Sequence, residues 1–134
     1  MKTKKSLISV IIVNYNGKHL LKRAIKSLQK QNFEHGIEII IVDNNSNDGS
    51  YDFVKKNYKN VKWVQTGENL SYPAANYGLS VSRGRYILFT NNDVEFKRDC
   101  IRKMYNVLVK DKSIGMVAPK LVNFHNRKID SKGT

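Results

Sequence analysis

Cysteine, proline and acidic residues are scarce in this sequence. The 134 residues include one cysteine and two prolines. A lone Cys100 excludes a disulfide within the chain and a zinc site built on several cysteines. No apolar run approaches the roughly 18 residues of a membrane span. The run from Leu7 to Val13 follows a basic leader but is too short for a signal peptide, and Asn14-Tyr15-Asn16 stands where a small-residue cleavage site would be. We therefore expect a cytoplasmic globular protein.

The shortage of acidic residues leaves a large positive charge. The sequence has 11 Asp and Glu residues and 24 Lys and Arg residues, which gives a formal net charge of +13. Such a charge favours anionic partners such as nucleotides, nucleic acid or an acidic membrane surface. The basic residues are scattered along most of the chain, which is equally typical of lysines that only cover solvent-facing surfaces. Both interpretations stay open on charge alone.

Short apolar runs alternate with segments of helical periodicity. The run at 7–13 is continuous and mostly β-branched, which is typical of a strand buried on both faces. Further short runs predict strands at 37–42, 61–64 and 86–89. Apolar residues at helical spacing predict helices at about 20–28, 50–58, 73–82 and 101–109. Pro73 suits the first turn of the third helix and Gly84 is expected to end it. This alternation predicts an α/β fold with a mainly parallel sheet and helices on both faces.

The C-terminal region lacks this regular pattern. Met116 to Val122 is predicted to be a fifth strand, interrupted by Pro119. Residues 123–134 are polar and basic and show no element of their own, so we expect a poorly structured tail on a single domain spanning 1–134. Because the pattern stops after Val122, we also expect the chain to be truncated.

Polar clusters follow three of the predicted strands. They are Asn14-Tyr15-Asn16-Gly17, Asp43-Asn44-Asn45-Ser46 and Asn91-Asn92-Asp93. Each cluster alone is typical of turn chemistry. In open α/β sheets, however, ligands bind outside the carboxyl ends of the strands, and parallel strands bring these ends to one edge. Three clusters at equivalent positions therefore predict a ligand site.

Four segments together resemble family 2 glycosyltransferases, which have the GT-A fold. The segments are residues 9–16, 38–50, 69–78 and 84–94, and the resemblance extends over roughly residues 6–122. They match the family's first strand, its second strand and loop, its N-x-G-F-x-x-x-N-x-G segment, and the strand that ends in its D-x-D-type metal motif. The Asp-Asn-Asn-Ser and Asn-Asn-Asp forms look most like the rhamnosyltransferase-like branch, which builds bacterial surface polysaccharides.

The resemblance implies a site for a nucleoside-diphosphate sugar. Asn14, Tyr15 and Asn16 would contact the nucleoside, and a tyrosine ring can pack on a base. A side-chain oxygen of Asp43 or Asn44 would accept a hydrogen bond from the base. Asn69 and Asn76 would fix the loop beneath the sugar diphosphate. Asn91, Asn92 and Asp93 would lie at the diphosphate, and Asp93 would bind a divalent cation, Mg²⁺ or Mn²⁺. The first acid of the family motif is an amide here, Asn91.

The same resemblance implies inverting transfer to a saccharide or lipid-linked acceptor in cell-surface polysaccharide synthesis. In this family the catalytic base is an acidic residue well downstream of the metal motif. Asp130 is the only carboxylate after Asp111, in a segment with no predicted fold. We therefore expect the base to be absent from this chain, and the chain to bind donor but transfer sugar poorly. Basic charge further predicts peripheral association with the inner face of the membrane.

Other functions remain open. The alternative is a non-catalytic nucleotide-sugar-binding module or one half of a split enzyme. A nucleic-acid-binding α/β domain is less favoured, because no RRM, KH or helix-turn-helix signature is present, and we expect no nucleic acid partner. A dinucleotide-dependent dehydrogenase is disfavoured because the first strand leads into Asn14-Tyr15-Asn16-Gly17 and not into a glycine fingerprint.

Overall fold

Four parallel strands form the central sheet, in the order β3-β2-β1-β4. The structure, a computed structural model, describes residues 6–131. The strands are β1 Ser6–Asn14, β2 Gly36–Asp43, β3 Lys62–Gln65 and β4 Tyr86–Asn91. The register sets Asn14 opposite Asp43 and Val13 opposite Asn91. The polar ends of three strands therefore lie level at one edge of the sheet.

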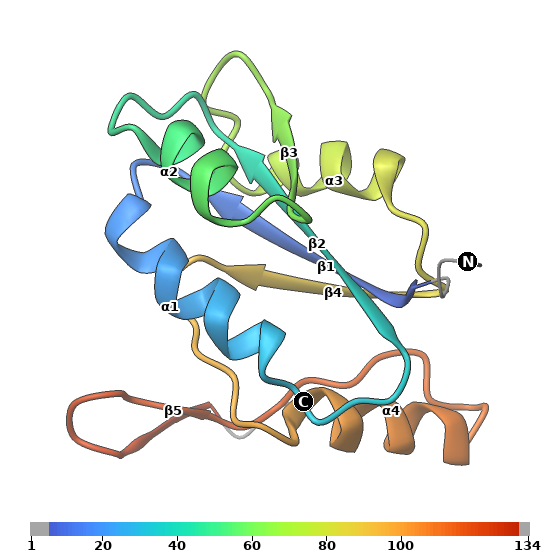
Figure 1. Cartoon of the computed structure of the whole chain (residues 1–134). Coiled ribbons are helices and arrows are strands. Elements are labelled where there is room, and N and C mark those ends of the chain that lie inside the picture. Colours follow the sequence, from blue (N-terminus) through green and yellow to red (C-terminus); the bar gives the residue numbers. More distant parts are fainter. Residues whose placement is uncertain (1–5, 132–134) are drawn as a thin grey trace.

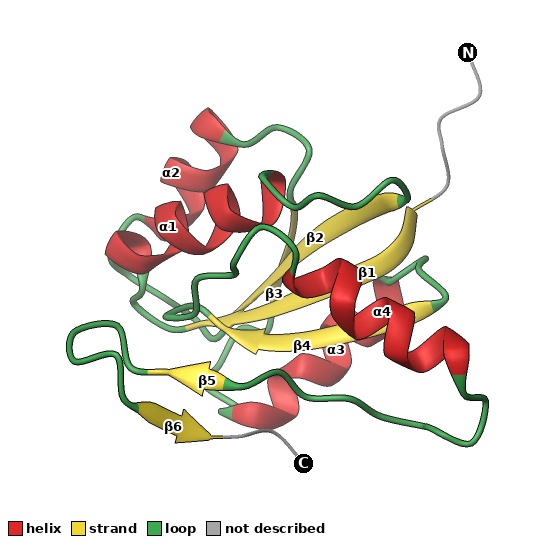
Figure 2. Ribbon diagram, turned by 90° about the horizontal axis from the view of Figure 1, so that it is seen from below, coloured by secondary structure: helices red, strands yellow, loops and turns green. Residues whose placement is uncertain are grey.

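Helices cover both faces of this sheet, as predicted (Figures 1 and 2). Helices α1 Lys18–Gln29, α2 Ser50–Asn57 and α4 Cys100–Lys110 contribute to the larger hydrophobic cluster on one face. The 3₁₀ turn η1 Tyr72–Ala74 and helix α3 Ala75–Val81 cover the other face. Within the described part of the chain, no helix combines the length and apolar character needed to cross a bilayer.

The core explains why the apolar runs fold as they do. Val10, Ile11 and Ile12 are all fully buried, because alternate side chains of β1 point into the two clusters. Leu21, Ile25 and Leu28 form the buried stripe of α1, with Lys22 and Lys26 exposed on its other side. Each such burial contributes on the order of 1.5–3 kcal/mol.

The third helix differs from its prediction. Instead of one helix over 73–82, the segment begins as the 3₁₀ turn and α3 ends at Val81, with Ser82 in extended conformation. Gly84 does not end the helix. It lies against β1, where an added Cβ would come within 2.5 Å of the Ser9 backbone nitrogen. The glycine is needed for close approach of two backbones, which a local pattern does not reveal.

The C-terminal region also differs from its prediction. Only Leu121–Val122 (β5) of the expected fifth strand is a strand, and Met116 is 83% exposed. The segment 123–134 was predicted to have no element, yet β6 Ile129–Ser131 pairs antiparallel with β5 in a separate two-stranded sheet. Asn123 organises the turn, since its backbone N–H donates to the Lys128 carbonyl at 2.7 Å. Residues 132–134 of the predicted tail lie outside the described residues.

Candidate functional site

Asn14 is a buried hub at the carboxyl edge of the sheet. Its side chain is fully buried, and its amide nitrogen donates to Asp43 Oδ1 at 2.8 Å and Ser46 Oγ at 3.3 Å. Its amide oxygen accepts a hydrogen bond from Asn92 Nδ2 at 2.9 Å. One side chain thus ties the end of β1 to the loops after β2 and β4. The three polar clusters converge as the strand topology predicts.

Asp43 is an anchor of this edge and not an exposed contact. Its residue is 1% exposed. Oδ1 accepts from Asn14 and from Ser46 Oγ at 2.6 Å, and Oδ2 accepts from the Ser46 backbone N–H at 2.9 Å and Gln65 Nε2 at 3.1 Å. These four bonds occupy the lone-pair sites of the carboxylate. Asp43 is therefore fully hydrogen-bonded within the protein, and its contact with a base stays a prediction.

Asn44 is likewise buried and holds the loop between β3 and η1. It is 2% exposed. Its Oδ1 accepts from the Leu70 N–H at 3.2 Å and its Nδ2 donates to the Ser71 carbonyl at 3.1 Å. The contact of Asn44 with the base likewise stays a prediction. The two hydrogen bonds of Asn44 fix the loop between β3 and η1 over the strand ends.

Asn69 and Asn76 flank that loop. Asn69 Oδ1 accepts from the Ser71 N–H at 3.0 Å, an Asx turn that holds Ser71 at a φ of 54°. Ser71, which stands where the resembling family has glycine, therefore adopts the left-handed φ that favours glycine. Asn76 is exposed in the first turn of α3. The predicted structural role fits Asn69, while Asn76 presents its amide to solvent.

Tyr15 and Asn16 follow β1 directly. Tyr15 is 53% exposed. Asn16 has a φ of 48°, its N–H donates to Ser46 Oγ at 2.8 Å, and its side-chain oxygen accepts from the Asn47 N–H at 2.9 Å. Asn16 therefore joins the loop after β1 to the loop after β2. Tyr15 remains an exposed aromatic ring beside this hydrogen-bonded polar edge.

The loop after β4 carries the predicted metal residue. Asn91 and Asp93 are exposed, and Asn92 turns inward to Asn14. Asp93 makes no hydrogen bond or ion pair with any residue from 6 to 131. No group of three or more His, Cys, Asp or Glu residues in that range could hold a metal ion. One free carboxylate fits a Mg²⁺ or Mn²⁺ ion that arrives with a diphosphate, because phosphate oxygens and water complete its shell.

Asp48 is a further organising residue that the sequence interpretation did not single out. Its Oδ2 accepts from the Lys18 N–H at 2.8 Å, and its Oδ1 accepts from the N–H and hydroxyl of Ser50. Burial alone would raise the pKa of Asp48, but the hydrogen bonds from Ser50 and Lys18 outweigh it and lower that pKa. Asp48 thus joins the first turns of α1 and α2. The Asp-Gly-Ser order before a helix is the signal that predicts this role.

Gly17 leaves room for the side chain of Asn92 to reach Asn14. A Cβ at this position would lie 2.0 Å from Asn92 Nδ2 and 2.6 Å from Asn14 Oδ1. The Asn14–Asn92 hydrogen bond therefore requires a residue without a side chain at the start of α1.

The chain matches the sequence model of the family "Glycosyl transferase family 2" over residues 9–132. Poly(ribitol-phosphate) beta-glucosyltransferase of Bacillus spizizenii is 32% identical over 112 residues, which cover 79% of this chain and 18% of that protein. GalNAc(5)-diNAcBac-PP-undecaprenol beta-1,3-glucosyltransferase of Campylobacter jejuni is 33% identical over 93 residues, covering 66% of this chain and 30% of that protein. The chain thus spans less than a third of these relatives.

A solved structure shares the fold. The mannosyltransferase PcManGT from Pyrobaculum calidifontis, in complex with GDP-Man and Mn²⁺, superposes with a TM-score of 0.78 and 21% identity. The match covers 90% of this chain and 37% of that one. The mainly parallel sheet with its flanking helices is therefore the N-terminal part of a GT-A fold.

Proposed function

The chain belongs to glycosyl transferase family 2, and from this premise we propose that it is the donor-binding part of an enzyme that transfers a sugar from a nucleoside-diphosphate sugar. The observation that carries the proposal is the edge organised by Asn14. Asp43 and Asn92 meet at this buried amide, while Tyr15 and Asp93 stay exposed around it. A rigid polar edge with an exposed ring and a free carboxylate fits a nucleotide with a cation-bound diphosphate.

We propose that different exposed residues contact different parts of the donor. We propose that the Tyr15 ring packs on the nucleobase, with the loop held by Asn44 and Asn69 as the opposite wall. Asn91 and Asp93 lie at the other side, where the diphosphate would reach the end of β4. In this arrangement Asn14, Asn16 and Asp43 act by holding the loops, and their effect on donor binding is indirect.

A divalent cation would be held by Asp93. Bound there, it would offset the negative charge that develops on the departing diphosphate. Because the chain supplies one free carboxylate at this place, we propose that the cation binds weakly without nucleotide and tightly with it. The Mn²⁺ in the mannosyltransferase complex supports cation use within the fold.

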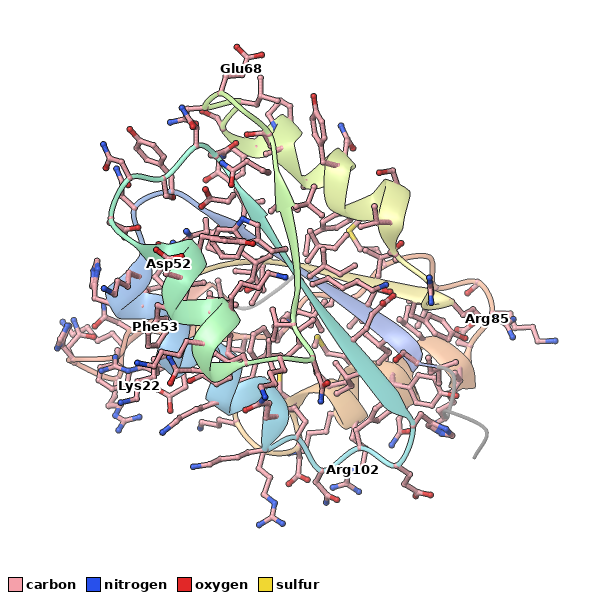
Figure 3. All side chains as sticks on the ribbon, turned by 45° about the horizontal axis from the view of Figure 1, so that its top comes forward. Lys22, Asp52, Phe53, Glu68, Arg85 and Arg102 are labelled. Atoms are coloured by element: carbon pink, nitrogen blue, oxygen red, sulfur yellow. The ribbon has the colours of Figure 1, made fainter. Side chains whose placement is uncertain are left out.

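We propose transfer with inversion, in which the acceptor hydroxyl attacks the anomeric carbon, the bond to the diphosphate breaks, and a carboxylate base takes the proton of the hydroxyl. Asp130 lies exposed on β6 and Glu68 at the tip of the loop after β3, where it points into solvent (Figure 3). We assign the base to neither. The proposal therefore predicts that this chain alone binds donor and transfers sugar slowly or not at all.

The names of the relatives support a role in cell-surface polysaccharide synthesis, with a saccharide or lipid-linked acceptor. We propose that the protein works on the cytoplasmic face of the membrane. The rhamnosyltransferase-like specificity rests on the Asp-Asn-Asn-Ser and Asn-Asn-Asp clusters and is part of the proposal.

Calorimetric titration tests the proposal. The chain is titrated with UDP, dTDP and GDP, each with and without Mn²⁺, and with an oligonucleotide. We expect saturable binding of one nucleoside diphosphate, strengthened by Mn²⁺ about tenfold or more, and no competition from the oligonucleotide. In Asp93→Asn the strengthening by Mn²⁺ should disappear, while binding without metal remains.

Asp52→Asn is the matched control, since it makes the same change at an exposed carboxylate in the first turn of α2, outside the proposed donor site. Its response to Mn²⁺ should equal that of the unaltered chain. Binding of none of the nucleotides would contradict donor binding. Equal loss of the Mn²⁺ effect in both variants would contradict the assignment to Asp93.

A further inference from the structure

The outer side of α1 is a continuous basic surface. Its exposed basic residues are Lys18, His19, Lys22, Arg23, Lys26 and Lys30, and the helix contains no acidic residue. Lys18, Lys22, Lys26 and Lys30 follow one another at four-residue spacing, so like charges are neighbours. Each such pair costs a helix about 0.2–0.5 kcal/mol. We call these six residues the basic face of α1.

Acidic residues contribute little to the groove along this face. Glu95 is the acidic residue that lines it beside Lys22, Arg23 and Lys26, and its Oε2 lies 3.8 Å from Arg23 Nε. Asp48 lies at the end nearer the strand ends but accepts hydrogen bonds from Lys18 and Ser50. The groove therefore keeps a strong positive excess.

The β5–β6 hairpin places apolar side chains next to this charge. Leu121, Val122, Phe124 and Ile129 are between 38% and 52% exposed. The guanidinium of Arg23 lies 4.5 Å from the centroid of the Phe124 ring, which fixes the turn of the hairpin against α1. Figure 1 shows the hairpin extending beside α1. Exposed aliphatic and aromatic side chains bordered by cations are typical of surfaces that enter the interface of an anionic bilayer.

We propose that the basic face of α1 and the β5–β6 hairpin together dock the protein on a membrane of anionic phospholipids. The cations contact lipid phosphates, and Phe124 with its apolar neighbours enters the headgroup region. The basic face of α1 begins at the carboxyl edge of the sheet, where we place the donor. Lys18 directly follows Gly17, and the Lys18 N–H donates a hydrogen bond to Asp48. Docking here would bring the donor site close to a lipid-linked acceptor. This last consequence rests on the proposed function, whereas the docking itself does not.

Co-sedimentation with vesicles tests the docking. The chain is mixed with vesicles of phosphatidylcholine alone and of phosphatidylcholine with 30 mol% phosphatidylglycerol, over a series of salt concentrations. We expect binding to the anionic vesicles only, weakening as salt rises. Lys22→Gln/Lys26→Gln should weaken this binding about tenfold or more, because each cation near an anionic surface contributes on the order of a fivefold change. Phe124→Ser should weaken it with the charge unchanged.

Lys110→Gln/Lys112→Gln is the matched control. It removes two exposed charges at the C-terminal end of α4, away from the proposed surface. This variant should bind vesicles within about threefold of the unaltered chain. Absence of binding to anionic vesicles would overturn the proposal, as would equal weakening by both double variants, which would indicate net charge alone. Binding to soluble polyphosphate without binding to vesicles would overturn it in favour of a free polyanion. Nucleotide binding, measured separately, reports on the donor site.

Discussion

At the scale of single residues, the carboxyl edge of the sheet, where we place the donor, depends on buried amides and one carboxylate. Asn14 uses both of its amide groups, and Asp43 accepts four hydrogen bonds. Within residues 6–131 no buried side-chain nitrogen or oxygen lacks a partner. A fully satisfied polar network holds loops in one arrangement, while a network that loses a member leaves a buried group unpaired.

Gly17→Ala tests this closure. The new methyl group would displace Asn92 from Asn14 and leave the Asn14 oxygen buried without a donor. We expect a loss of about 1–3 kcal/mol in the free energy of unfolding, measured by urea denaturation. Gly115→Ala is the control, because nothing lies within 4 Å of its Cβ position. If the two variants were equally stable, the close contact at Gly17 would be refuted.

At the scale of elements, a second polar network joins the strands at the opposite end of the sheet. Glu38 of β2 accepts from Ser9 of β1 at 2.5 Å and from Lys62 of β3 at 2.7 Å. It also accepts from the N–H of Arg83, just before β4. Burial alone would raise the pKa of Glu38, but the hydrogen bonds from Lys62, Ser9 and Arg83 lower it to about 2.

Glu38→Gln should therefore destabilise the fold in a pH-dependent way. The pKa is depressed in the folded state, so the stabilisation is fully present above about pH 4.5 and is lost as pH falls toward 2. At neutral pH we expect the variant to lose roughly 1–3 kcal/mol in the free energy of unfolding. Denaturation curves between pH 7 and pH 2.5 should show the difference from the unaltered chain shrinking. A constant difference over that range, or an equal loss in Glu68→Gln, would contradict the role of Glu38.

The sequence predicts elements well where one local pattern decides them. The strand at 7–13 and the helix at 20–28 each lie within the observed β1 and α1, because their apolar spacing matches the faces that they bury. The role of Gly84 was predicted wrongly and the role of Glu38 was not predicted. Both roles come from contacts with Ser9 on another strand, which a local pattern does not reveal. The same holds for the hairpin, whose strands are short and exposed and so leave no apolar periodicity.

The site was predicted in part for a similar reason. Convergence of the three clusters follows from strand topology alone. Strand topology does not predict which members of the clusters are exposed. Asp43 and Asn44 are turned inward by hydrogen bonds with Gln65 and Leu70 on later segments. Residue type and position thus predict where the polar clusters meet, and tertiary hydrogen bonding decides which of their side chains are exposed.

At the scale of the whole molecule, the two proposed surfaces adjoin. The donor edge lies at the carboxyl ends of the strands, and the basic face of α1 starts at that edge and runs along the outside of the helix. Lys22 and Phe53 line the groove between α1 and α2 where the two surfaces meet (Figure 3). On the two proposals together, part of the net charge of +13 serves membrane docking, while the proposed donor site is built mainly from amides.

The most direct test of the account follows the backbone amide resonances of the labelled chain by NMR during titration with UDP, dTDP or GDP and Mn²⁺. We predict saturable shifts confined to residues 14–17, 44–49, 66–71 and 91–93, with the basic face of α1 and the β5–β6 hairpin unchanged. Shifts that spread along α1 and the hairpin while the strand ends stay unperturbed would contradict a donor site at the carboxyl edge of the sheet.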